Sequence, residues 1–139
     1  MIPVTQDIFY NDPQGRKGNC FQAAIASIVE KPLNEVPHFA AIEDDTWWEQ
    51  TLKFLNDNGY DVFHCEIAEL PHVKDNLVLV VGKSQRGVNH SVIYKNGSLA
   101  HDPHPSKTGV TDISWCAVIK PINEVKWKQL FTNNKKRRL

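Results

Sequence analysis

The chain has 139 residues, 41% of them hydrophobic and 23% charged, and its formal net charge is zero. This length suits one domain with a sizeable core, and a chain without excess positive charge is not expected to take nucleic acid as its main partner. We expect a single domain over 1–132 and a solvated basic tail over 133–139, the alternative being a tail that docks on phosphate or on an acidic partner.

The sequence carries no signal for a membrane or for export. No apolar run approaches the roughly 18 residues that a membrane-spanning helix needs. The first residues also lack the basic and apolar regions of a secretory signal. We therefore expect a cytoplasmic protein that makes no membrane contact. The sequence gives no indication of the oligomeric state.

Two helices are predicted in the first half of the chain. Apolar side chains recur at helical spacing over 20–30, and Asn19 is placed to cap this helix through its side-chain oxygen. Pro32 ends it, because the residue before a proline is disfavoured in helical conformation. An irregular segment over 31–41 leads to a second helix over 46–58.

Strand-like runs fill the second half. The unbroken apolar run at 77–81 suits a central strand buried on both faces, and Asn96-Gly97 is a strong signal for a two-residue hairpin. Helices followed by four or five strands in a mostly antiparallel meander predict an α+β domain with its helices on one face of the sheet. The predicted strands cover 60–67, 77–81, 88–94, 98–101 and 113–119.

The three cysteines differ in their surroundings. Cys20, Cys65 and Cys116 form an odd set without paired spacing, which favours neither a disulfide framework nor a zinc site. Cys65 and Cys116 lie in apolar strand-like runs, so we expect them to be buried packing residues. Cys20 follows glycine and polar residues at the start of a predicted helix. No cofactor is indicated.

Cys20 is followed in the chain by His90 and Asp102, in the order nucleophile, base and orienting carboxylate. A helix N-terminus and a nearby imidazolium both lower the pKa of a thiol, which attacks as the thiolate. The hairpin at Asn96-Gly97 would bring Asp102 beside His90 and so fix its tautomer. Gln14, in a loop rich in Asp, Pro and Gly, would join the Cys20 backbone N–H in binding an oxyanion.

Other histidines leave alternatives open at this site. His101 or His104 could be the base in place of His90, and the three imidazoles with Asp102 could bind zinc or iron. We prefer His90 as the base because its surroundings predict a strand buried beside the helix. We do not favour a metal, because these residues do not share one helix face and no second ligand pair is visible.

These motifs resemble those of papain-like cysteine peptidases. The pattern comprises Gln14 six residues before Cys20, a helix beginning at Cys20, Asn89-His90 at a strand start and Asp102-Pro103 after the next strand. It is most similar to the bacteriocin-leader (double-glycine) peptidases, and 86–106 also resembles small papain-like proteins of bacteriophages. The resemblance implies a papain-like fold with Cys20 as nucleophile, His90 as general base, Asp102 as orienter and Gln14 as oxyanion donor.

The resemblance has departures. Asn19 and Phe21 flank Cys20, where papain has Ser and Trp, and an Asp stands where papain has Asn. The leader peptidases are usually fused to transporters, and this sequence holds no such segment. The identity of the substrate is therefore not transferable.

The predicted activity is that of a thiol hydrolase which cleaves an amide or isopeptide bond in a peptide or protein through a thioester. Acyl transfer or transglutamination uses the same residue order and stays open, as does a catalytically inactive papain-like protein that binds a host factor. For Trp47, Trp48 and the segment 31–41, the favoured interpretation is core and connector, and the alternative is that they shape a substrate groove. The predicted substrate-binding residues are Asn19, Trp47, Asn89 and His104.

Overall fold

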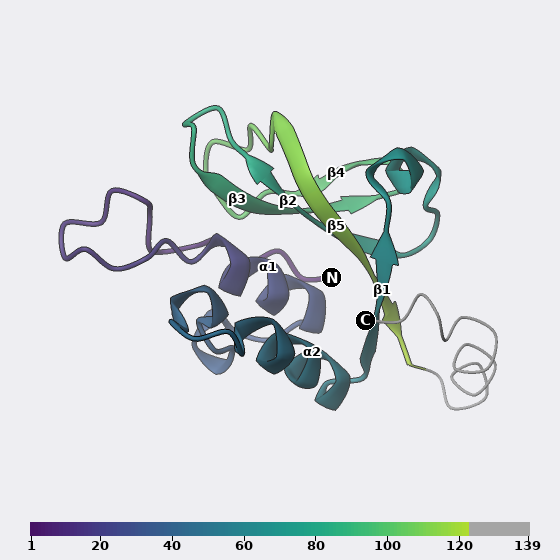
Figure 1. The fold of residues 1–139 in the computed structure, drawn as a ribbon, viewed down its shortest axis with the longest axis horizontal. Helices are drawn as coiled ribbons and strands as arrows, with labels where there is room; N and C mark the ends of the chain where they lie inside the picture. The colour runs from purple at the N-terminus through teal and green to yellow at the C-terminus, as the bar shows by residue number, and fades with distance from the viewer. Residues whose placement is uncertain (123–139) are drawn as a thin grey trace.

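The protein, seen in a computed structural model, is described over residues 1–122, and the predicted basic tail at 133–139 lies outside the described residues. One antiparallel sheet of five strands is packed against two α-helices, so the described chain is an α+β domain (Figure 1). The strands are β1 (Tyr60–Cys65), β2 (Leu77–Lys83), β3 (Asn89–Lys95), β4 (Ser98–His101) and β5 (Asp112–Pro121).

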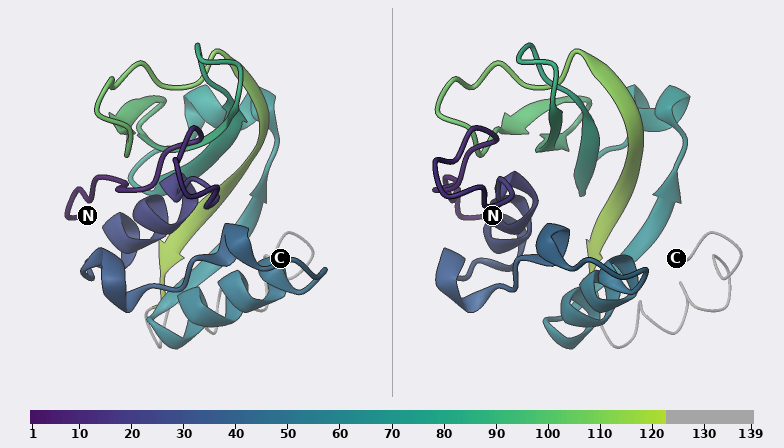
Figure 2. Two further views of the ribbon diagram at one scale, coloured as in Figure 1. Left: turned by 90° about the vertical axis from the view of Figure 1, so that its left-hand side faces the viewer. Right: turned by 60° about the vertical axis from the view of Figure 1, so that its left-hand side comes forward.

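Both α-helices lie on the same face of the sheet, as the sequence predicts (Figure 2). Helix α1 (Cys20–Val29) packs against β3, and α2 (Trp47–Asp57) packs against β1. The larger core lies between these helices and the sheet. Its fully buried side chains come from both layers, and they include Ala24, Ile25, Ile28, Leu55, Leu79, Ile93, Ala117 and Ile119.

The predicted helices differ from the observed ones at their ends. Helix α1 stops at Val29, one residue before the predicted end, because Glu30 adopts a left-handed conformation (φ 59°) and its N–H donates to the Ala26 carbonyl. The expectation that Asn19 caps α1 is wrong, since no side chain caps this end. The segment 31–41 holds two short 3-10 helices, Leu33–Glu35 and Phe39–Ala41.

The order of the strands corrects the predicted meander. The strands run β1-β5-β2-β3-β4 across the sheet, so only β2, β3 and β4 follow one another as neighbours. Strand β5 returns to lie between β1 and β2, antiparallel to both. This inner position suits its apolar residues, of which Cys116, Ala117 and Ile119 are buried. The run at 77–81 forms the central strand β2, as predicted.

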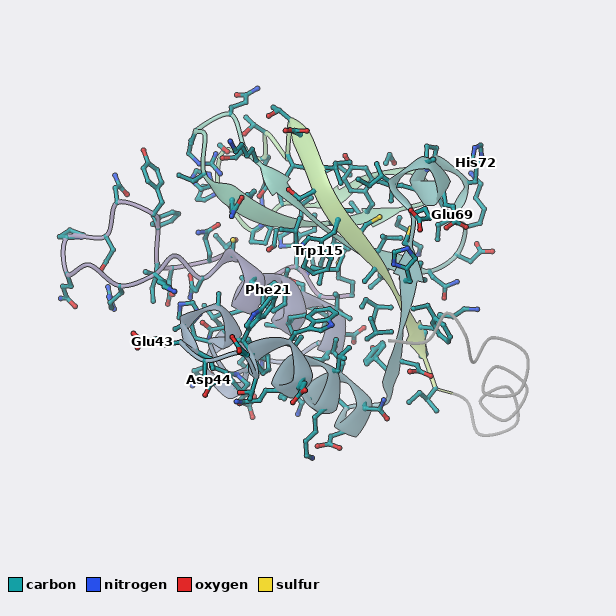
Figure 3. The ribbon with its side chains drawn as sticks, in the orientation of Figure 1. Phe21, Glu43, Asp44, Glu69, His72 and Trp115 are labelled. Atoms are coloured by element: carbon teal, nitrogen blue, oxygen red, sulfur yellow. The ribbon has the colours of Figure 1, made fainter. Side chains whose placement is uncertain are left out.

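A second, smaller core covers the opposite face of the sheet. Cys65 and Cys116 are register partners in β1 and β5, and both are 3% exposed. They pack with Leu70 from a 3-10 helix, η3 (Ile67–His72), which the sequence analysis missed. Figure 3 shows Glu69 and His72 on this segment, at the opposite end of the sheet from α1. The prediction that these two cysteines are buried packing residues is confirmed.

The β3–β4 hairpin is the element that local sequence specified most fully. Asn96 and Gly97 have φ values of 53° and 82°, the two left-handed conformations that a type I′ turn requires. The turn pairs Lys95 with Ser98, and a shift in register between Tyr94 and Ile93 then places Ile93 opposite His101. Asp102, one residue further along, therefore leaves the sheet near the beginning of β3.

Within residues 1–122, no helix combines the length and the apolar character needed to cross a bilayer.

Candidate active site

Cys20 is the first residue of α1 and lies where this helix meets β3. The first N–H groups of an α-helix have no carbonyl partner within the helix, and in α1 no side chain caps them. Such N–H groups stabilise negative charge placed beside them. The position thus favours both a thiolate at Cys20 and an anion held close to it.

Asn19 fixes the beginning of α1 to the N-terminal segment. Its Oδ1 accepts hydrogen bonds from the backbone N–H of Asp7 (3.1 Å) and Ile8 (2.8 Å). Its Nδ2 donates to Asp7 Oδ1 (2.7 Å) and to Gln22 Oε1 (3.2 Å). The side chain is 1% exposed, with its donors and acceptors already engaged. Asn19 therefore positions Cys20, and it is not available to bind a substrate as the sequence analysis expected.

His90 on β3 and Asp102, the residue directly after β4, form a buried pair. His90 Nε2 lies 2.6 Å from Asp102 Oδ1, and the two residues are 3% and 1% exposed. The carboxylate also accepts the backbone N–H of His104 and of Gly109, each at 2.8 Å. With these bonds, Asp102 is held in one orientation. Since Nε2 of His90 faces Asp102, Nδ1 is the ring nitrogen left for the thiol.

The pKa values of this pair move in opposite directions. Burial alone would lower the pKa of His90, but its hydrogen bonds with Asp102 and Cys20 and their charges raise it to about 9. Burial alone would raise the pKa of Asp102, but the His90 ring and the backbone N–H groups of His104 and Gly109 lower it to about 2. At neutral pH the pair is therefore an imidazolium beside a carboxylate.

The thiol of Cys20 contacts the His90 ring, on the side away from Asp102. Burial would raise the pKa of its thiol, but the hydrogen bond with the His90 ring and the charge of that ring bring the pKa below its usual value. The backbone N–H and the hydroxyl of Ser91 also hydrogen-bond to the sulfur and lower the pKa further. Ser91 is a site residue that the sequence analysis missed, although its place next to His90 on β3 was a usable signal.

A cavity of about 400 Å³ opens over Cys20. Trp47 and Asn89, both predicted to bind substrate, line it together with Cys20 and His90. Ala40 of the segment 31–41 also lines the cavity. The remaining lining residues are Lys17, Gly18, Phe21, Val81, Ser91 and Trp115.

Gln14 does not lie at this cavity, so the structure corrects its predicted role as oxyanion donor. Asn19 N–H donates to the Ile8 carbonyl, which closes the intervening residues into a loop that projects from the domain (purple in Figure 1). Gln14 is exposed in this loop, where its backbone N–H bonds to Asp12 Oδ2 at 3.2 Å. The six-residue spacing therefore does not bring its side chain back to the sulfur.

The two other candidate histidines have separate roles. His101 Nε2 bonds to the Val4 carbonyl at 2.8 Å, which ties the N-terminal segment to β4. The His104 ring packs edge-on against His90, with centroids 6.0 Å apart, and its Nδ1 bonds to Ser106. His104 thus supports the His90 ring and does not line the cavity over Cys20, contrary to its predicted role in substrate binding. Among residues 1–122, no cluster of three or more His, Cys, Asp or Glu side chains is arranged to hold a metal ion.

Comparison with protein-family models, with curated proteins and with solved structures found no match to this chain.

Proposed function

We propose that this protein is a papain-like cysteine hydrolase that cleaves an amide or isopeptide bond in a peptide or protein. The observation that carries the proposal is the contact between Cys20 and His90, whose pKa values shift in opposite directions. Across the Cys20–His90 hydrogen bond, the pKa of the thiol is lowered and the pKa of the imidazole is raised to about 9. Both shifts favour the pairing of a thiolate with an imidazolium, which is the reactive form of a cysteine nucleophile.

The first half of the reaction forms a thioester. Cys20 Sγ attacks the carbonyl carbon, and the carbonyl oxygen takes up the negative charge near the uncapped N–H groups of α1. His90 Nδ1 then donates its proton to the departing nitrogen, so that the C–N bond breaks and a neutral amine leaves. The raised pKa keeps His90 protonated at neutral pH, which an amide leaving group requires.

The second half releases the acid. A water molecule takes the place of the amine, and His90, now neutral, accepts a proton from it as it attacks the thioester carbonyl. The C–S bond breaks, the carboxylic acid leaves, and Cys20 returns to the thiolate paired with imidazolium. Asp102 keeps the ring oriented through both halves by its 2.6 Å bond to Nε2.

Digestion of a peptide library tests this proposal. Incubation of a proteome-derived library with the wild-type protein, followed by mass spectrometry of new termini, is expected to give cleavages that Cys20→Ser and His90→Gln both abolish. A parallel incubation with hydroxylamine should give hydroxamates at the same bonds, since this amine intercepts a thioester. Equal product patterns for wild type and Cys20→Ser would overturn the proposal, and so would a wild type that yields neither product while it binds intact proteins.

A further inference from the structure

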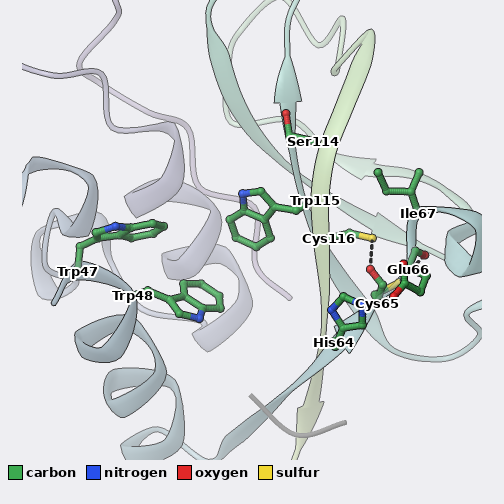
Figure 4. Close-up of a pocket in the computed structure, with 9 residues that line it drawn as sticks. All are labelled: Trp47, Trp48, His64, Cys65, Glu66, Ile67, Ser114, Trp115 and Cys116. Atoms are coloured by element: carbon green, nitrogen blue, oxygen red, sulfur yellow. Dashed lines mark hydrogen bonds and ion pairs between the residues drawn. The ribbon is translucent and has the colours of Figure 1, made fainter. Parts of the chain in front are cut away.

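A second cavity, of about 410 Å³, lies beside the first and has mainly aromatic and apolar walls. Three tryptophans line it, Trp47 and Trp48 from α2 and Trp115 from β5. Figure 4 shows Trp115 projecting from β5 toward the two tryptophans of the helix, with Ile67 on the other side of the strand. We call this the tryptophan cavity.

The aromatic rings of the tryptophan cavity form a continuous series of contacts. Ring centroids are 5.7 Å apart for Trp47 and Trp48, and 5.2 Å apart for Trp48 and Trp115. Trp47 also contacts Phe21, the residue after Cys20, at 5.8 Å. All three tryptophans remain partly exposed, and Ile67 at the rim is 45% exposed. The cavity therefore presents apolar surface that the described fold leaves uncovered.

One wall of the cavity is a strand edge without a partner strand. Strand β1 pairs with β5 as far as Cys65–Cys116 and then ends, whereas β5 extends to Asp112. On the β1 side, no strand within residues 1–122 pairs with β5 between 112 and 115. The register with β2 shifts here from Val81–Trp115 to Gly82–Ile113, which leaves Ser114 as the extra residue of a bulge. Backbone groups at such an edge can pair with an added extended chain.

The tryptophan cavity adjoins the cavity over Cys20. Trp47 and Trp115 line both. A chain bound over Cys20 in extended form would therefore pass these two rings before it reaches the edge of β5. Side chains of an extended chain alternate in direction, so that one of them would point into the tryptophan cavity while its backbone lies along Ser114 and Trp115.

We propose that the tryptophan cavity is a specificity site that takes an aromatic or large aliphatic side chain of the substrate, close to the bond that Cys20 attacks. This inference rests on the proposed function for the identity of the substrate. Burying an aromatic side chain among three indole rings gains both apolar area and ring contacts. An acidic side chain is disfavoured, because it would lose its hydration among the mainly apolar walls of this cavity.

Binding can be tested without catalysis. The Cys20→Ala protein, labelled with ¹⁵N, is titrated with acetyl-Gly-Phe-Gly-amide, and the indole N–H signals are assigned with single Trp→Phe variants. The signals of Trp48 and Trp115 are expected to shift in a saturable way. Acetyl-Gly-Ala-Gly-amide and acetyl-Gly-Asp-Gly-amide should shift them much less, because they share the backbone and lack the aromatic side chain.

Variants distinguish binding in the tryptophan cavity from nonspecific binding elsewhere on the protein. Trp48→Ala should weaken binding of the Phe peptide by about fivefold or more. Ile67→Glu should weaken it as well, and this change at an exposed rim position leaves the core intact. Tyr10→Ala is the matched control, since Tyr10 is an aromatic residue that is 57% exposed outside both cavities.

The outcomes distinguish this inference from the proposed function. Saturable shifts that depend on Phe, Trp48 and Ile67 would support the specificity site even if Cys20 proved unreactive. Absent shifts, equal shifts with the Ala peptide, or affinity unchanged by both Trp48→Ala and Ile67→Glu would overturn it, whatever the reactivity of Cys20.

Discussion

Cys20 and Cys116 are two thiols of one domain, and their surroundings shift the pKa in opposite directions. For both, burial is the largest influence, and it raises the pKa. At Cys116 the next neighbours are the Cys65 thiol and the carboxylates of Glu69 and Glu66, which raise it further, to about 12. At Cys20 the neighbours are the His90 ring and two hydrogen-bond donors of Ser91, which lower it. The partners of each thiol, rather than its burial, therefore set the direction in which its pKa shifts.

The largest expected effect is a difference in labelling between these two cysteines. At pH 7 a thiol with a pKa of about 12 is ionised to roughly one part in 10⁵. We expect iodoacetamide to modify Cys20 at least about 1,000-fold faster than Cys116, as quantified by mass spectrometry of the modified peptides. Similar alkylation rates for Cys20 and Cys116 in the folded protein would contradict the difference between their pKa values.

Unfolding supplies the control for this labelling experiment. In guanidinium chloride both cysteines lose their neighbours, and their rates should agree within a few-fold. A difference that persisted in the unfolded chain would show that local sequence, and not the fold, causes it.

The next largest effect is on the free energy of unfolding, and it concerns Asn19, which holds the beginning of α1 beside Cys20. Asn19→Ala should lower the free energy of unfolding by about 2–3 kcal/mol, because it leaves the Asp7 and Ile8 N–H groups and the Asp7 carboxylate without their partner. Gln14→Ala, which removes the same functional group from the exposed loop, should change it by less than about 0.5 kcal/mol. Chemical denaturation measures both, and equal losses would contradict the roles given to these two residues.

The substitution Asp102→Asn should lower the pKa of His90. Removing the carboxylate takes away the main partner that raises the pKa of the ring to about 9. We expect the pKa to fall by at least about one unit, which corresponds to about 1.4 kcal/mol. Titration of the His90 imidazole ¹⁵N signals in both proteins measures it. A pKa of His90 unchanged by Asp102→Asn would mean that Cys20 alone sets it.

The smallest expected effect is on acid stability. The pKa of Asp102 is about 2 in the folded protein and near 3.8 when unfolded. The lowered value stabilises the fold above pH 3.8, and this contribution is lost as the pH falls toward 2. Between pH 7 and pH 3 the wild type should lose about 1 kcal/mol more unfolding free energy than Asp102→Asn. Denaturation curves at both pH values test this, and parallel losses would contradict it.

Much of the site's framework could be predicted from local sequence. Asn96-Gly97 specifies a type I′ turn, which folds β4 back along β3 toward His90. The final position of Asp102 also depends on a register shift between Ile93 and Tyr94, which the sequence did not predict. Apolar spacing and the residues before Cys20 likewise indicated where α1 begins. These features depend on neighbours in the chain, which is why a single sequence reveals them.

The features that could not be predicted depend on contacts between distant parts of the chain. Nothing local to β5 dictates that it should lie between β1 and β2, yet this insertion creates the unpaired edge at Ser114. In the same way, the bond from Asn19 to Ile8 closes a loop and turns Gln14 away from the sulfur, although its spacing fits the resemblance. The spacing of motif residues predicts where a side chain lies only when the conformation of the chain between those residues is also fixed.

The central claim is that Cys20 is a nucleophile activated by His90, and the pH dependence of its alkylation tests this most directly. The rate with iodoacetamide would be measured from pH 4 to 9 in a Cys65→Ser, Cys116→Ser background, with and without His90→Ala. The account predicts a rate that stays high well below pH 7 and falls by about two orders of magnitude at pH 6 when His90 is removed. A rate that rises only near pH 8.5, and is the same in both proteins, would contradict it.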